Sequence, residues 1–388
     1  MTQLLLLFVG LLAGVLLVYL LQYSRTDDKT QRQSLPRDYL QGLNFLLNEE
    51  PDKAVDHFIK MLEVDSDTVE THLALGNLFR RRGEVNRAIR IHQNLIARPS
   101  LTAEDRNEAM LALATDYLGA GVFDRAEKLF SKLVELKAYT PRSLGFLLDI
   151  YQQEKAWEKA INTAQKIALE TGKSTQRQIA HYYCELAEID IESGSTDNAY
   201  NYLKQALSVD KNCVRASLLL GELEYISGRH KHAIRIYRQA GEKNPNFISE
   251  VITLLSEAYQ SLGEEDVLEQ YIHEILRKYP QSPIILIIVE QFNNWCQDEV
   301  IVNALVDYVN KHPSMLGLHY LITLKMTKAN PAEQAVLRLL HGVTEKLQSE
   351  HPRYKCEACG FSGKTMHWLC PSCKSWGEIR YSYLTEDK

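Results

Sequence analysis

The stretch GNLFRRRGEVNRAIRIHQNLI, from Gly76 to Ile96, decides the fold of this chain of 388 residues. Gly76 precedes Phe79 by three residues, Gly83 marks a turn between two helices, and Ala88 opens the core of the second helix. Small residues at these places let two helices cross closely, while large aromatic residues fill the gap to the next pair. We therefore predict a pair of packed helices here.

The same alanine recurs along the chain. Its six copies lie 34, 38, 34, 39 and 34 residues apart: Ala54, Ala88, Ala126, Ala160, Ala199 and Ala233. Unrelated helices of a generic bundle would not return to one alanine at this interval. A period of 34 residues is the length of the tetratricopeptide repeat, and the pattern resembles that family. The predicted fold class is therefore all-α, a superhelical solenoid over residues 38–350 with eight or nine helix pairs.

Two insertions interrupt the period, at Ala97–Asp105 and at Leu169–Gln178. We expect both to lengthen the loops between helix pairs. The resemblance also implies a long groove that holds a protein or peptide. By alignment to the repeat pattern, the residues expected to face this groove are Asn77, Arg80, Arg81, Thr115, Asp149, Gln152 and Tyr225. A solvated helix face is the alternative for each of them.

A second motif lies near the end of the chain, in KCEACGFSGKTMHWLCPSCKSW from Lys355 to Trp376. Ten residues separate its two C-x-x-C pairs, whose thiolates are Cys356, Cys359, Cys370 and Cys373. Four thiolates in a tetrahedron form a closed structural metal site. The segment 351–388 resembles a rubredoxin-type metal-binding module, which leaves iron and zinc both open.

The module is too short to bury much apolar surface by itself. We expect it to fold around its metal ion and to pack on the last helices or back into the groove, with Trp368 and Trp376 available for contact. Cys184, Cys213 and Cys296 lie in helical sequence and are expected to be small buried residues.

The N-terminal residues predict a membrane anchor. The run from Leu4 to Leu21 is apolar except for Tyr19, long enough to cross a bilayer as a helix. A cleavable signal peptide is the alternative, but no Lys or Arg precedes the run and no A-x-A site follows it. We assign residues 1–24 to the transmembrane anchor and 25–37 to a cytoplasmic tether.

Positive charge after the span places the N-terminus in the periplasm and the bulk of the chain in the cytoplasm; the flanking residues are Arg25, Lys29, Arg32 and Arg37. Gly10 and Gly14 form a G-x-x-x-G motif that could admit a second transmembrane helix.

Composition and the motifs that are absent reduce the number of possible function classes. A formal net charge of -6 argues against nucleic acid as the main partner. The sequence contains no G-x-S-x-G, H-E-x-x-H or P-loop motif, so we do not expect an enzyme.

The order of anchor, repeats and four-cysteine module resembles the lipopolysaccharide assembly protein B family of Gram-negative bacteria. This resemblance implies a non-catalytic inner-membrane adaptor that regulates lipopolysaccharide biosynthesis. It would bring the lipid A pathway deacetylase to a membrane AAA+ protease for degradation, and organise other lipopolysaccharide assembly or regulatory membrane proteins. The sequence does not decide between a monomer and a homodimer. The alternative is a membrane-tethered electron-transfer protein of the rubredoxin type.

Overall fold

The computed structural model describes residues 37–48, 50, 53–54, 57–58, 69–280, 282–292 and 295–381. The predicted anchor, with Gly10 and Gly14, and nearly all of the tether lie outside these residues. Among the described helices, none combines the length and the apolar character that a bilayer crossing needs. The chain divides into two compact units, with the boundary between Phe146 and Leu147.

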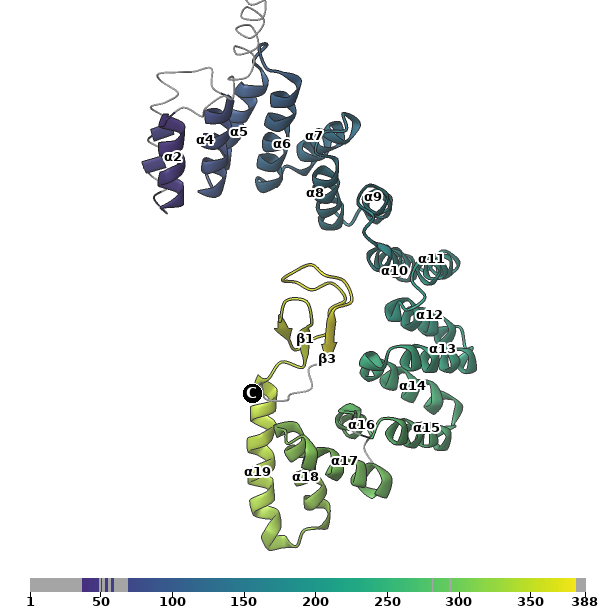
Figure 1. Cartoon of the computed structure of the whole chain (residues 1–388). Helices are drawn as coiled ribbons and strands as arrows, with labels where there is room; N and C mark the ends of the chain where they lie inside the picture. Colours follow the sequence, from purple (N-terminus) through teal and green to yellow (C-terminus); the bar gives the residue numbers. More distant parts are fainter. Residues whose placement is uncertain are drawn as a thin grey trace, which may run out of the picture. The chain divides into compact units, whose positions relative to one another are not determined.

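The first unit consists of paired helices (Figure 1). Its described helices are α2 (Arg37–Leu47), α4 (Val69–Arg81), α5 (Val85–Ile96), α6 (Ala103–Gly119), α7 (Phe123–Glu135) and the start of α8 (Thr140–Gln153). The stretch quoted at the outset forms α4 and α5, and Gly83 between them has a φ of 79°. Glycine takes this left-handed conformation without steric cost, which makes the tight turn possible.

The second unit continues the helix pairs and ends in a small sheet (Figure 1). Its first helices are α9 (Trp157–Thr171), α10 (Gln176–Glu192), α11 (Thr196–Val209), α12 (Val214–Ile226), α13 (His230–Lys243), η1 (Pro245–Phe247) and α14 (Ile248–Leu262). They are followed by α15 (Glu265–Lys278), α16 (Ile284–Gln291), η2 (Trp295–Gln297), α17 (Glu299–Lys311), α18 (Met315–Lys328) and α19 (Pro331–Glu350).

The six repeat alanines confirm the predicted packing, because none of them exposes any surface. Gly221, in the first helix of a pair, acts in the same way. A methyl group added at Gly221 in α12 would lie less than 3.0 Å from three ring atoms of Tyr237 in α13. The two helices can therefore approach this closely only when one of them carries glycine at the crossing.

The two insertions have different outcomes. Six residues separate Ile96 at the end of α5 from Ala103 at the start of α6, so a longer loop is confirmed there. The second expectation is wrong, because α9 continues through Thr171 and α10 begins at Gln176. Most of that insertion extends helices and leaves a short connection through Gly172, which caps α9 with a φ of 69°.

The chain ends in an antiparallel sheet of three short strands in the order β2-β1-β3. These are β1 (Tyr354–Cys356), β2 (Ser362–Gly363) and β3 (Ile379–Tyr381). The strand β1 pairs Tyr354 with Gly363 on one side and with Tyr381 on the other. The four predicted cysteine ligands lie in and between these strands, in the described residues 351–381 that we call the module.

Candidate metal centre and its docking surface

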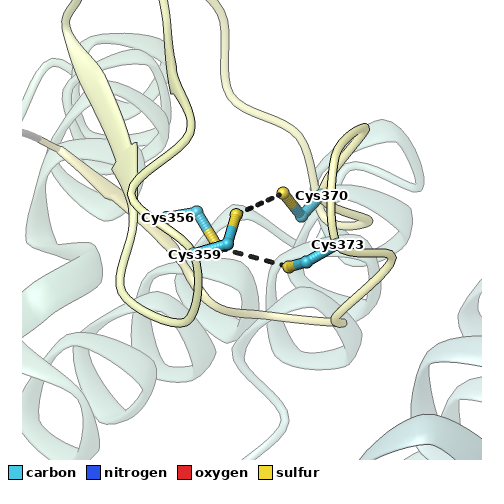
Figure 2. A group of neighbouring side chains, drawn as sticks. All are labelled: Cys356, Cys359, Cys370 and Cys373. Carbon is cyan, nitrogen blue, oxygen red and sulfur yellow. Dashed lines mark hydrogen bonds between the residues drawn. The ribbon is translucent and has the colours of Figure 1, made fainter. Parts of the chain in front are cut away.

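The four cysteines of the module converge on one point (Figure 2). All four Sγ atoms lie within 4.8 Å of one another, and the pairs Cys356–Cys373 and Cys359–Cys370 are 3.8 and 3.7 Å apart. Four thiolates around one ion at a metal–sulfur distance of about 2.3 Å would lie about 3.8 Å apart. The geometry therefore fits a tetrahedral metal site, and this donor set suits both zinc and iron.

Two matching backbone turns position these thiolates. The N–H of Gly360 donates to the carbonyl of Cys356 at 2.9 Å, and the N–H of Lys374 donates to that of Cys370 at 3.0 Å. Both turn residues are left-handed, with φ of 76° at Gly360 and 58° at Lys374. The two C-x-x-C pairs are thus equivalent knuckles, although the second uses a lysine where glycine would fit with less strain.

The environments of the thiols differ across the site. Burial raises the pKa of Cys356 to about 12, whereas hydrogen bonding with the side chain and backbone of Ser375 lowers the pKa of the exposed Cys373 to about 6. A bound metal ion requires all four as thiolates, so it would displace protons on binding.

The module packs on the repeat helices of the second unit through Trp376. This side chain is only 4% exposed, and its ring stacks on His181 of α10 at a centroid distance of 5.1 Å. The edge of Tyr182 lies 5.8 Å away, and the indole N–H donates to Oε1 of Gln152 at 3.1 Å. The tryptophan therefore joins the end of α8 to the middle of α10.

A second aromatic contact extends this surface along the repeats. Trp368 stacks on Phe247 of η1 at 5.4 Å and lies 5.9 Å from the ring of His181. Gly377 faces the same histidine, and a methyl group added there would lie 2.8 Å from Nε2 of His181. Only a residue without a side chain fits between the module and α10 at this point.

Charged groups surround the aromatic contacts. Arg177 of α10 forms an ion pair with Glu378 of the module, and Arg353 of the module pairs with Glu290 of α16 at 2.8 Å. Glu290 also accepts a hydrogen bond from the hydroxyl of Tyr381 at 3.3 Å. The module thus contacts helices from α8 to α16, so it is not confined to the last helices, the first of the two positions expected from the sequence.

Sequence reasoning missed most of this docking surface. His181, Arg215 and Glu250 occupy one repeat position in α10, α12 and α14, 34 and 35 residues apart. His181 and Arg215 are each 4% exposed, and Arg215 lies with its Cζ 5.8 Å from the ring of Trp376. The recurrence of a polar residue at the same repeat position was the sequence signal that could have identified this surface.

The electrostatic surroundings keep His181 neutral. Burial, and after it the positive charges of Arg215, Arg177 and Arg380, together lower its pKa to about 3. A neutral imidazole can stack on indole without carrying a buried charge.

The residues predicted to face the groove differ in their exposure and in their contacts. Gln152 contacts the module, Asp149 is exposed on α8, and the hydroxyl of Tyr225 lies 2.8 Å from Oγ of Ser261. In the first unit, Arg81 is exposed at the end of α4. The hydroxyl of Thr115 donates to the backbone carbonyl of Leu111 at 2.7 Å. Their role in binding a partner stays a prediction.

Arg80 belongs to a buried network in the first unit. Its guanidinium donates to Oδ1 of Asp116 at 2.7 Å and to Oδ1 of Asn77 at 2.6 Å. The other oxygen of Asp116 lies 2.5 Å from Nδ1 of His92, and both of these residues are fully buried. This network links α4, α5 and α6, so Arg80 and Asn77 have a structural role in addition to any partner contact.

Both the repeat helices and the metal module resemble known protein families. Residues 354–380 match the rubredoxin metal binding domain, and residues 71–106 and 190–265 match tetratricopeptide repeats. A tetratricopeptide repeat protein from Parabacteroides merdae has a solved structure similar over 71% of this chain and 98% of its own, at 14% identity and a TM-score of 0.34. That score is too low to add to the repeat assignment.

Two relatives match nearly the full length. Lipopolysaccharide assembly protein B of Escherichia coli K12 is 36% identical over 360 residues, which cover 92% of each chain. The protein of the same name from Haemophilus influenzae is 35% identical over 367 residues, again 92% of each chain. With this identity over this length, the chain belongs to the lipopolysaccharide assembly protein B family.

Proposed function

We propose that this protein is a non-catalytic adaptor of the bacterial inner membrane that regulates lipopolysaccharide biosynthesis. It presents the lipid A pathway deacetylase to a membrane AAA+ protease, which degrades the deacetylase, and it organises other proteins of lipopolysaccharide assembly. The observation that carries this proposal is a stack of helix pairs in a chain of the lipopolysaccharide assembly protein B family. Stacked helix pairs form extended surfaces that suit protein recognition.

The proposed location supports this role. The apolar run from Leu4 to Leu21 would anchor the chain, and the basic residues after it would keep the repeats on the cytoplasmic side. A short tether then confines the repeats to the membrane surface, beside a membrane protease. Confinement raises the effective concentration of the two proteins toward each other without any additional contact.

The metal module contributes rigidity to the adaptor in this proposal. It contacts Gln152 of α8, His181 of α10, Phe247 of η1 and Glu290 of α16. An adaptor must hold two partners in a fixed geometry, and a module that contacts several repeats at once restricts their bending. We propose that the ion is iron or zinc; elemental analysis of the purified protein distinguishes the two.

Depletion of the protein tests the adaptor function. We expect the half-life of the lipid A pathway deacetylase to lengthen when the chain is depleted, and to return to normal when the intact chain is restored. A protease-deficient strain serves as the control, because depletion should then have no further effect. An unchanged half-life on depletion would contradict the proposal.

One observation favours the alternative, a membrane-tethered electron-transfer protein. Cys359 and Cys373 are exposed, so an iron ion in the site would lie close to solvent and to a redox partner. This function requires iron with a reversible reduction that growth depends on. A zinc-substituted protein that restores growth would exclude it.

A further inference from the structure

A second group of metal-ligating side chains lies in the second unit, away from the four cysteines. Glu269 and His273 are four residues apart on α15, so they share one face of that helix. Asp298, the residue before α17, faces them, and its Oδ2 lies 2.6 Å from Nε2 of His273. One ligand atom from each of these three residues lies within 4.8 Å of the other two.

Backbone hydrogen bonds fix the orientation of Asp298. Its Oδ1 accepts the N–H of Val300 at 2.8 Å and that of Ile301 at 3.2 Å, which leaves Oδ2 directed toward His273. Burial by itself would raise the pKa of Asp298, but the hydrogen bonds from His273, Ile301 and Val300 outweigh burial and lower it. Asp298 therefore has Oδ1 held by the backbone of α17, while Oδ2 and Nε2 of His273 lie close enough together to bind one cation in place of the proton they share.

The group holds one carboxylate more than a helix cap and an ion pair require. An N-terminal cap and an ion pair need only Asp298 and His273. Glu269 adds a second carboxylate, whose side chain is exposed on α15. The group thus brings one imidazole and two carboxylates together, and a divalent cation can bind all three.

Space for an ion and its water ligands lies beside these side chains. Glu269 and Asp298, but not His273, line an open cavity of about 640 Å³, together with Gln260, Trp295 and Gln297. A site with three protein ligands and open positions filled by water is a common arrangement for zinc. One imidazole and two carboxylates form a nitrogen and oxygen donor set, which suits zinc, manganese or cobalt and differs from the sulfur set of the module.

We propose that Glu269, His273 and Asp298 form a second divalent metal site, of the zinc type, that joins α15 to the start of α17. This site is independent of the adaptor function and of the four-cysteine centre. Its ion strengthens the contact between two helices that belong to different pairs.

Titration of the full-length protein in detergent with zinc tests the proposal, starting from protein whose four-cysteine site is already loaded. Isothermal calorimetry and elemental analysis should find a second bound equivalent, and the melting temperature should rise with it. Loss of even an outer partner of a metal ligand weakens binding about 10- to 100-fold, so H273Q, D298N and E269Q should each weaken the second equivalent at least tenfold. Asparagine remains a good cap, so D298N should leave α17 intact.

The matched control is Glu274→Gln, on the same helix, whose parent side chain is 71% exposed. It should leave the second equivalent unchanged. The proposal is overturned if the loaded protein binds no second zinc ion. It is overturned equally if H273Q abolishes binding while D298N and E269Q do not, because that pattern belongs to a lone surface histidine.

Discussion

At the scale of single residues, His181 has the most unusual surroundings. The arginines that face it come from α10, α12 and β3, and its ring lies against Trp376 and Trp368. In the unfolded chain the imidazole takes up a proton below its ordinary pKa of 6.5, whereas in the folded chain it does so only near 3. Protons therefore favour the unfolded or undocked state between these two values, and stability falls as the pH falls from 6.5 toward 3.

This difference predicts a pH dependence. One shifted group changes the free energy of unfolding by up to about 1.4 kcal/mol per pH unit inside the window. We expect the stability of the wild-type chain to fall more steeply below pH 6.5 than that of H181Q, which has no titrating ring. Denaturant unfolding at a series of pH values measures both slopes. Equal slopes would show that His181 is not buried as a neutral ring.

At the scale of helices, the close crossing of α12 and α13 allows a comparison of two glycines. Gly221→Ala places a methyl group against the ring of Tyr237, which is 1% exposed and cannot move aside easily. Overpacking of this kind costs about 1–3 kcal/mol. We expect the midpoint of thermal unfolding to fall accordingly.

Gly145→Ala in α8 is the matched control, because a methyl group there has no neighbouring atom within 4 Å. Alanine in a helix is favoured over glycine by about 0.5–1 kcal/mol, so this variant should be neutral or slightly more stable. If both variants lost stability equally, steric contact with Tyr237 would not be the reason for glycine at 221.

The helices also show what local sequence can and cannot predict. The repeat alanines and the C-x-x-C pairs were predictable because each depends on neighbours less than 40 residues away. The docking of the module was not, since His181 and Arg215 resemble ordinary polar residues on a solvated helix face. Their burial depends on Trp376, and the bond from that tryptophan to Gln152 spans 224 residues. A pattern within one or two repeats gives no information about a contact between residues this far apart in the sequence.

At the scale of the whole molecule, the metal ion should control whether the module stays docked. Replacing Cys356 and Cys359 with serine removes two of four ligands, and a module this small depends on its ion for folding. We expect the emission of Trp376 and Trp368 to shift toward longer wavelength as these rings become exposed, while the helical circular dichroism of the repeats changes little.

Cys296→Ser is the control for this change, because Cys296 lies in η2, far along the chain from the four ligands. It should alter neither the emission nor the metal content. A double variant that lost its metal but kept the emission of the wild-type chain would show that the module docks without an ion.

The bond between Gln152 and Trp376 also has a consequence for synthesis. The ribosome makes α8, α9 and α10 well before it reaches the module, so Trp157, His181 and Tyr182 have no covering tryptophan in a nascent chain. An incomplete chain thus displays an aromatic surface that a finished one hides. Premature termination before residue 354 would leave that surface open to chaperones and proteases, which recognise exposed apolar groups.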